Sequence, residues 1–152
     1  MTSPDGWFED FVPGQRMRHA RAATIDDVEG SFLAKLVMNT AHAHWNDHLP
    51  EIPGLGSGRL VYGLLTASVV FGLASQDTAE HAIRELGCTG LRFRAPVHHG
   101  DTIEAFTEVV SVRPSDEDDA GMVVFHHWGR RHDRVVVFEG ERSLLIRRRP
   151  TP

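Results

Sequence analysis

One stretch of the chain is uncharged and mainly apolar, and it predicts a buried helix. Residues 60–76 carry no charge and lie between Arg59 and Asp77. The stretch is shorter than the ~20 apolar residues that a membrane span requires, and several of its residues are small or polar. Its apolar residues fall on nearly every face of a helix, a pattern typical of a helix that is covered on all sides. We therefore expect Leu60–Gln76 to be a central helix enclosed by the rest of the chain.

The second half of the chain has the apolar and polar alternation of β-strands. In residues 102–112, Ile103 and Ala105 share one face, while Glu104 and Glu108 share the other. The acidic residues 114–121 then predict a solvated hairpin loop. Successive strands with short connections indicate an antiparallel meander. We expect strands over Thr89–Ala95, Thr102–Val112, Met122–Arg130 and Val135–Arg147.

The N-terminal part predicts a second helix and an edge strand. Thr24 and Asp27 have the spacing of an N-cap residue and an acid at the third helical position. The apolar face of this helix would consist of Val28, Phe32 and Leu36. We expect Trp7–Met17 to form an irregular lead-in and an edge strand. Because no repeat or linker divides the chain, the sequence predicts a single α+β domain over residues 1–152 with a sheet curled around one helix.

The composition of the chain mainly argues against certain classes of function and certain locations. Lys and Arg number 16 against 21 Asp and Glu, so the net charge of −5 disfavours binding to nucleic acid. The single cysteine, Cys88, cannot form an internal disulfide, and Met1–Trp7 lacks the pattern of a signal peptide. We expect a cytoplasmic protein that binds neither nucleic acid nor a membrane. The 10 histidines titrate near neutrality, so some of them are candidates for acid–base chemistry.

The densest polar cluster is residues 39–48, and three interpretations of it remain open. His42, His44, Asp47 and His48 have nearly the spacing of a zinc-binding run, but one extra residue breaks it. The second interpretation is a loop whose histidines are solvated. The third is acid–base catalysis beside an anion-stabilising site at the start of the central helix.

Gly63 is the candidate for that anion-stabilising site. The glycine-rich residues 54–58 lead the chain into the helix, and the first turn of a helix has N–H groups without an intrahelical partner. A helix that begins inside a core directs these donors at a bound ligand. The missing Cβ of Gly63 would allow a ligand to approach closely, or would merely allow the helix to pack against a strand.

Three stretches carry a resemblance to a known family. They are residues 39–44, residues 61–68 and the segment Leu91–Thr102, which reads LRFRAPVHHGDT. Together they resemble the MaoC-like (R)-specific enoyl-CoA hydratases, and the Asn-Thr and His-Trp-Asn wording resembles the branch that hydrates mesaconyl-CoA and itaconyl-CoA. The resemblance covers roughly residues 8–147 and implies a hotdog fold, in which an antiparallel sheet wraps one long helix.

The resemblance also implies roles for individual residues. His44 matches the catalytic histidine and Gly63 the glycine whose amide stabilises the thioester oxygen, whereas Asn39 stands where the family has an aspartate. An amide can orient a water molecule but cannot accept its proton. Either His44 transfers the protons alone, or an acid such as Asp47 assists, or activity is lost. The expected substrate-binding residues are Tyr62, Ser68, Arg59, Arg92 and Arg94, the arginines being candidates to grip a free carboxylate.

The expected reaction is reversible hydration of a 2-enoyl-CoA, with no metal or organic cofactor besides the coenzyme A of the substrate. A non-catalytic acyl-CoA-binding subunit is the alternative that Asn39 favours. A thioesterase is less favoured because residues 60–76 contain no Asp or Glu. Since exposed sheet edges are usually covered, we expect a homodimer or a higher homo-oligomer.

Overall fold

A computed structural model describes residues 5–48 and 51–150 of the chain. The helical elements are η1 (Phe8–Asp10), α1 (Asp27–Leu36), η2 (His42–His44) and α2 (Gly63–Thr78), and the strands are β1 (Arg16–Thr24), β2 (Ala82–Phe93), β3 (Thr102–Pro114), β4 (Ala120–Arg131) and β5 (Val136–Arg147). The strands form one antiparallel sheet in the order β1-β3-β4-β5-β2. The meander β3-β4-β5 and the acidic loop between β3 and β4 are confirmed.

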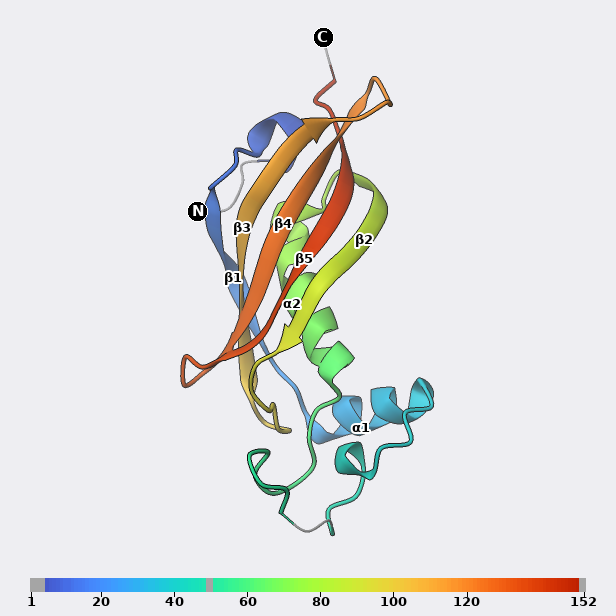
Figure 1. The fold of residues 1–152 in the computed structure, drawn as a ribbon, viewed down its shortest axis with the longest axis vertical. Helices are drawn as coiled ribbons and strands as arrows, with labels where there is room; N and C mark the ends of the chain where they lie inside the picture. Colours follow the sequence, from blue (N-terminus) through green and yellow to red (C-terminus); the bar gives the residue numbers. More distant parts are fainter. Residues whose placement is uncertain (1–4, 49–50, 151–152) are drawn as a thin grey trace.

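The sheet curves around α2, and the N-terminal end of this helix lies at the end of the sheet that is nearest to α1 (Figure 1). Buried side chains of α2 pack against inward-facing residues of the sheet, such as Val70 against the side of β4 where Gly129 leaves room. A methyl group at Gly129 would lie 2.4 Å from the Val70 side chain, so a glycine is required for this close approach. The chain reaches α2 from α1, which lies beyond one end of the sheet (Figure 1).

The expected enclosure of α2 on all sides is wrong. Leu64, Ser68, Gly72 and Gln76 are exposed, and their spacing of four residues places them on one stripe of the helix. The helix also begins at Gly63 and not at Leu60, because residues 60 and 61 pair with neighbouring segments instead: Leu60 bridges His98, and the Val61 N–H donates to the Val97 carbonyl. None of the helices in the described residues is both long and apolar enough to cross a membrane.

Two of the N-terminal expectations are also wrong. The edge strand is Arg16–Thr24 and not Trp7–Met17, and its inward-facing positions include the polar His19, which hides the alternation in the sequence. The N-cap of α1 is Asp26, whose Oδ1 accepts the Glu29 N–H at 2.8 Å, because Thr24 is the last residue of β1.

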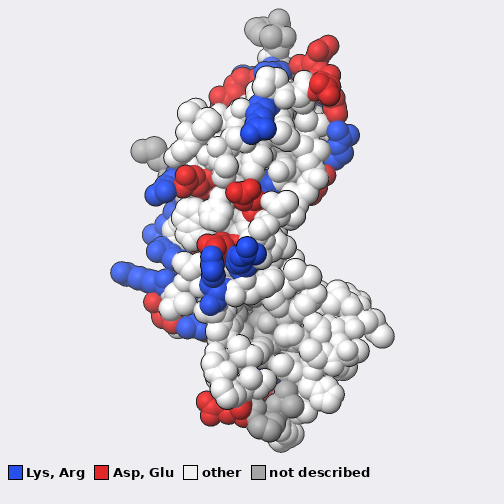
Figure 2. Space-filling model, viewed as in Figure 1, with Lys and Arg blue, Asp and Glu red and all other residues white. Residues whose placement is uncertain are grey.

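The apolar face expected for α1 exists but faces outward. Val28, Phe32 and Leu36 are exposed, and the helix packs inward through Gly30 and Ala34. The small residues face inward because a methyl group at Gly30 would lie only 2.5 Å from the His99 Nε2. On the face that Figure 2 shows, the lobe that contains α1 displays few charged side chains, whereas charged side chains gather over the sheet.

A chain of polar side chains lies sealed beneath the C-terminal half of α2. The His19 Nδ1 is 2.6 Å from the Asp77 Oδ2, and the Thr107 Oγ1 is 2.7 Å from both the His19 Nε2 and the His127 Nδ1. All of these side chains are buried. Burial lowers the pKa of His127 to about 3, with a further contribution from the Arg142 charge, so its ring is neutral at physiological pH.

Candidate active site

A cavity of about 260 Å³ opens at the N-terminal end of α2. His44, Gly63, Thr66 and Arg94 line it: His44 belongs to η2, Gly63 and Thr66 belong to α2, and Arg94 follows β2. Much of the remaining wall is apolar and includes Leu55, Leu60, Val61, Phe93, Val97 and Val137. The volume is close to the ~300 Å³ lower limit of common ligand sites, so it suits a small organic group.

His44 is held by a backbone carbonyl. Its Nδ1 lies 3.0 Å from the Leu60 carbonyl oxygen, and the Leu60 N–H donates in turn to the Ala43 carbonyl at 2.8 Å. A carbonyl oxygen can only accept a hydrogen bond, so the Nδ1 carries the proton. In the neutral ring the Nε2 then has the free lone pair, which is the arrangement that a general base requires. The neighbouring Tyr62 ring packs against His44 in an edge-type arrangement with a centroid separation of 5.6 Å.

The first turn of α2 supplies backbone donors beside this imidazole. Tyr62 is the N-cap residue, and its side chain makes no capping hydrogen bond. Among the described residues, the N–H groups of Gly63 and Leu64 have no hydrogen-bond partner, whereas those of Leu65 and Thr66 donate to the Tyr62 carbonyl. The helix dipole makes this end favourable for negative charge. The cavity therefore combines a proton acceptor with donors for a developing anion.

Both interpretations of Gly63 find support. The residue lines the cavity, and a Cβ at this position would lie 3.1 Å from the Phe93 Cε1. The missing side chain thus makes room for the Phe93 ring, and the backbone of Gly63 remains accessible from the cavity.

The titratable side chains that line the cavity, within the part of the chain described, are His44 and Arg94. The Arg94 guanidinium pairs with the Glu139 carboxylate, which its Nε contacts at 2.9 Å. Its side chain is 53% exposed, so it lies at the rim and can still reach a ligand. No carboxylate of the described residues lines the cavity.

The remaining predicted site residues do not line this cavity. The Asn39 Oδ1 accepts the Ala41 N–H at 2.9 Å, in the turn that precedes η2. Ser68 is exposed and donates to the Leu64 carbonyl, and Arg92 is exposed on the edge strand β2. The Arg59 guanidinium is bound to acidic side chains away from the cavity. Of the predicted site residues, the structure thus brings His44, Gly63 and Arg94 together at the cavity and places the remaining ones elsewhere.

Thr66 was missed by the sequence analysis. It is buried, lines the cavity and lies one helical turn after Gly63. Residues three apart share a helix face, so this spacing could have identified it.

The zinc interpretation gains no support. Within residues 5–48 and 51–150, no group of three His, Cys, Asp or Glu side chains is arranged to hold a metal ion. Asp47, a member of the expected run, contacts the Arg59 Nε at 2.6 Å.

Comparison with known proteins now identifies the family. The family model described as mesaconyl-CoA hydratase matches residues 8–148, and the chain belongs to this family. It is 35% identical over 160 residues to a mesaconyl-CoA hydratase of Haloarcula marismortui, covering 96% of this chain and 43% of that protein. It is 28% identical over 143 residues to an (R)-specific enoyl-CoA hydratase of Rhodospirillum rubrum, covering 92% of this chain and 91% of that protein. The chain thus spans less than half the length of the mesaconyl-CoA hydratase.

Solved structures agree on the fold. A MaoC-domain dehydratase from Chloroflexus aurantiacus superposes with a TM-score of 0.87 and 30% identity, over 99% of this chain and 44% of that one. A Mycobacterium tuberculosis protein described as a double hotdog fold superposes with a TM-score of 0.73 and 21% identity, over 96% of this chain and 46% of that one. The expected α+β hotdog fold is confirmed, and this chain corresponds to about half of the double form.

Proposed function

We propose that this chain catalyses the reversible addition of water across the α,β double bond of a 2-enoyl-CoA thioester. The observation that carries the proposal is the shared cavity of the His44 imidazole and the first turn of α2. The names of the relatives, which are hydratases and dehydratases acting on CoA thioesters, support the same reaction.

In the proposed reaction the His44 Nε2 takes a proton from water as the water oxygen bonds to the β-carbon of the substrate. The electron pair of the double bond moves toward the thioester oxygen, where the Gly63 N–H group stabilises the negative charge. The imidazolium then returns its proton to the α-carbon, so atoms and charge balance. The proposal requires no cofactor other than the coenzyme A of the substrate. General base catalysis of this kind contributes about 10²- to 10⁴-fold in rate.

Asn39 has no catalytic contact in this scheme. Because its side-chain oxygen accepts the Ala41 N–H, we assign Asn39 to shaping the turn before His44. The family's usual aspartate is therefore not required, provided that His44 both takes and returns the proton.

A small branched enoyl group with a free carboxylate is the proposed substrate class, as in mesaconyl-CoA or itaconyl-CoA. The limited volume of the cavity favours a short acyl group, and Arg94 at its rim can pair with the free carboxylate. Arg94 is thus the substrate-binding arginine in this proposal.

A second hotdog unit is part of the proposed assembly, either another copy of this chain or a related subunit. The edge strand β2 and the α2 stripe that starts at Leu64 are both exposed and need cover. Several relatives have more than twice the length of this chain, which supports pairing of two such units. Light scattering on the purified chain would give twice the monomer mass for a homodimer, and the monomer mass would contradict it.

The test is a panel of thioesters that includes crotonyl-CoA and mesaconyl-CoA, followed spectroscopically for loss of the conjugated double bond. His44→Gln should lower the rate about 10²- to 10⁴-fold. His42→Gln is the matched control, because His42 is exposed in the same short turn and does not line the cavity. An unchanged rate in His44→Gln would contradict the proposal.

The second candidate function is a non-catalytic acyl-CoA-binding subunit. The lack of a carboxylate among the described cavity residues favours it, and binding of mesaconyl-CoA without turnover would support it. Release of free coenzyme A would instead indicate a thioesterase. The nearest acid on α2, Asp77, is buried beside His19 at the opposite end of the helix, which disfavours that reaction.

A further inference from the structure

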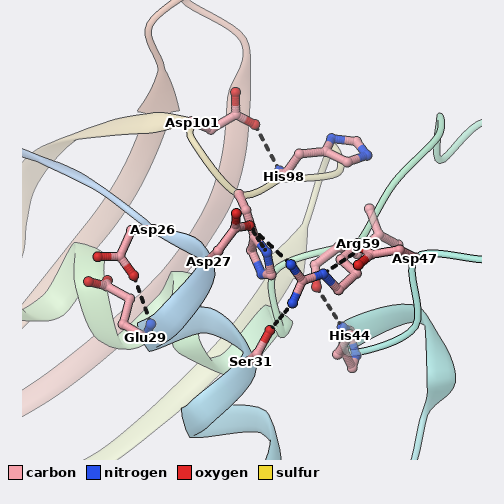
Figure 3. A network of polar contacts seen from close by, with 11 residues as sticks. Asp26, Asp27, Glu29, Ser31, His44, Asp47, Arg59, His98 and Asp101 are labelled. Carbon is pink, nitrogen blue, oxygen red and sulfur yellow. Dashed lines mark hydrogen bonds and ion pairs between the residues drawn. The ribbon is translucent and has the colours of Figure 1, made fainter.

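Arg59 joins segments that are distant in the sequence. Its Nε lies 2.6 Å from the Asp47 Oδ1, its Nη1 donates to the Ser31 hydroxyl, and its Nη2 lies 3.4 Å from the Asp27 Oδ1. Figure 3 shows the guanidinium between α1 and the segment that contains His44. The Arg59 side chain is only 21% exposed, although it carries a charge.

This network is connected to the proposed base through short stretches of chain. Arg59 immediately precedes Leu60, whose carbonyl accepts the His44 Nδ1–H. Asp47 follows His44 by three residues, so the Arg59–Asp47 contact lies beside the bond between His44 and Leu60. Two bonds thus hold the His44 turn against the entry to α2, one at each end of a short segment.

Helix α1 gives the network a fixed support. The His99 Nδ1 lies 2.8 Å from the same Asp27 oxygen that faces Arg59, and Gly30 packs directly on the His99 ring. His99 belongs to the turn between β2 and β3, so α1 is fastened to the sheet through it. The contacts run from the sheet through α1 and Arg59 to Asp47 and Leu60.

We infer that Arg59 is a positioning residue for His44. The guanidinium fixes the segment from His44 to Asp47 and the Leu60 carbonyl against α1, and this keeps the His44 Nε2 directed at the cavity. Arg59 does not line the cavity, and three of its nitrogens already have partners. The role replaces the expected one, in which Arg59 grips a substrate carboxylate. The inference rests on the proposed function, in which His44 is the base.

An arginine is required because the three partners lie in different directions around one planar group. A lysine ammonium is a compact charge on a flexible stem and cannot reproduce a planar set of donors. A displacement of about 1 Å of a catalytic group can reduce a rate about 100-fold. Small shifts of the His44 turn therefore have large consequences for catalysis without abolishing the fold.

The kinetic test uses Arg59→Gln, Arg59→Lys and Asp47→Asn, with crotonyl-CoA and mesaconyl-CoA as substrates. For each Arg59 variant we expect kcat to fall about 10- to 100-fold for both substrates, with KM within about twofold. Asp47→Asn removes the negative charge from the same contact but keeps an acceptor oxygen, at a side chain that is 64% exposed, so it carries little risk to folding. Arg16→Gln is the matched control, since Arg16 pairs with Glu108 on the far edge of the sheet. A rise in KM confined to mesaconyl-CoA would overturn the inference and make Arg59 a substrate ligand.

A second measurement does not depend on activity. In ¹⁵N-histidine spectra, His44 of the unmodified chain should show the Nδ1–H tautomer that its bond to the Leu60 carbonyl dictates, and Arg59→Gln should shift it toward a tautomer mixture. If the chain proves inactive on every thioester, this spectrum still tests the positioning role. An unchanged His44 spectrum in Arg59→Gln would overturn the inference even if the proposed function held.

The third measurement is a double-mutant cycle. If Asp47 acts through Arg59, the variant that combines Asp47→Asn with Arg59→Gln should lose no more kcat than Arg59→Gln alone. Fully additive losses would mean that the two residues act independently, and the positioning role would be wrong.

Discussion

Similar side chains lie near the two ends of α2, but their surroundings are very different. At the C-terminal end, Asp77, His19 and His127 form part of a buried chain linked through a threonine hydroxyl. At the N-terminal end, His44 is tied to a backbone carbonyl, and the nearby charges of Asp47 and Arg59 lie on segments outside the sheet (Figure 3). One group of residues is sealed within the fold, and the other borders a cavity.

The difference shows that a histidine needs access to a cavity before it can transfer protons to a ligand. His127 bonds through its Nδ1 and leaves its Nε2 without a partner among the described residues, and His44 likewise bonds through its Nδ1, to the Leu60 carbonyl. The His127 Nε2, however, faces closely packed protein, and burial lowers the pKa of this ring to about 3. His127 therefore stays neutral and stabilises the fold, whereas His44 lines the cavity in which the proposed substrate and water would bind.

The largest expected effect on stability comes from a substitution that disrupts the buried chain of polar side chains at the C-terminal end of α2. Asp77→Ala leaves the His19 Nδ1–H buried without its acceptor, so we expect the free energy of unfolding to fall by about 3–5 kcal/mol. Urea denaturation would measure the loss. Asp77→Asn retains an acceptor oxygen and should cost clearly less. The rate constant of the folded fraction should be unchanged, and a selective loss of kcat in Asp77→Asn would break the separation between the two ends.

The pH dependence of stability should report the buried His127. Its pKa is about 3 in the folded chain against the ordinary 6.5, so the unfolded chain binds the extra proton between these values. Stability is therefore full above pH 6.5 and falls as the pH decreases toward 3, by roughly 2 kcal/mol between pH 7 and pH 5. Urea titrations at both pH values would measure this change. His127→Gln should remove this part of the slope, whereas the control His126→Gln, at a half-buried position, should keep it.

How far the sequence predicts the fold depends on how regular each element's pattern is. Strands β3, β4 and β5 were placed within a few residues because apolar and polar positions alternate along them. The edge strand β2 begins at Ala82 and not at Thr89, because it is exposed on both faces and shows little alternation. The position of β1 was missed since a buried histidine occupies a position where an apolar residue would be expected.

The sequence predicts the site only in part, for a related reason. His44 and Gly63 could be identified by their resemblance to family motifs, and the cavity brings them together. The role inferred for Arg59 depends on Asp27, Ser31 and Asp47, whose proximity is a tertiary property that no local pattern records. The exposed face of α1 was misread because amphipathic spacing shows that residues share a side but not which side faces the core.

Gly63→Ala tests the packing of the cavity wall at the N-terminal end of α2. The added methyl group would lie 3.1 Å from the Phe93 ring, which is half exposed and can move outward. We expect the unfolding free energy to change by less than about 1 kcal/mol, because the helix start otherwise tolerates alanine. Displacement of Phe93 from the cavity wall should lower kcat/KM about tenfold, which is about 1.4 kcal/mol. Gly72→Ala is the control, since a Cβ there meets no atom within 4 Å. Equal activity of the two variants would show that Phe93 does not shape the acyl site.

The smallest effect is expected on the outer face of α1. Phe32 is 58% exposed, and serine has a similar helix propensity, so Phe32→Ser should change the unfolding free energy by no more than about 0.5 kcal/mol. Urea denaturation at two protein concentrations would test this. A loss above about 2 kcal/mol that shrinks on dilution would mean that a second chain covers this face, because a contact between two chains stabilises the fold less as the protein is diluted. In that case the cavity end would be buried in an assembly, and the contrast between the two ends of α2 would hold for the isolated chain alone.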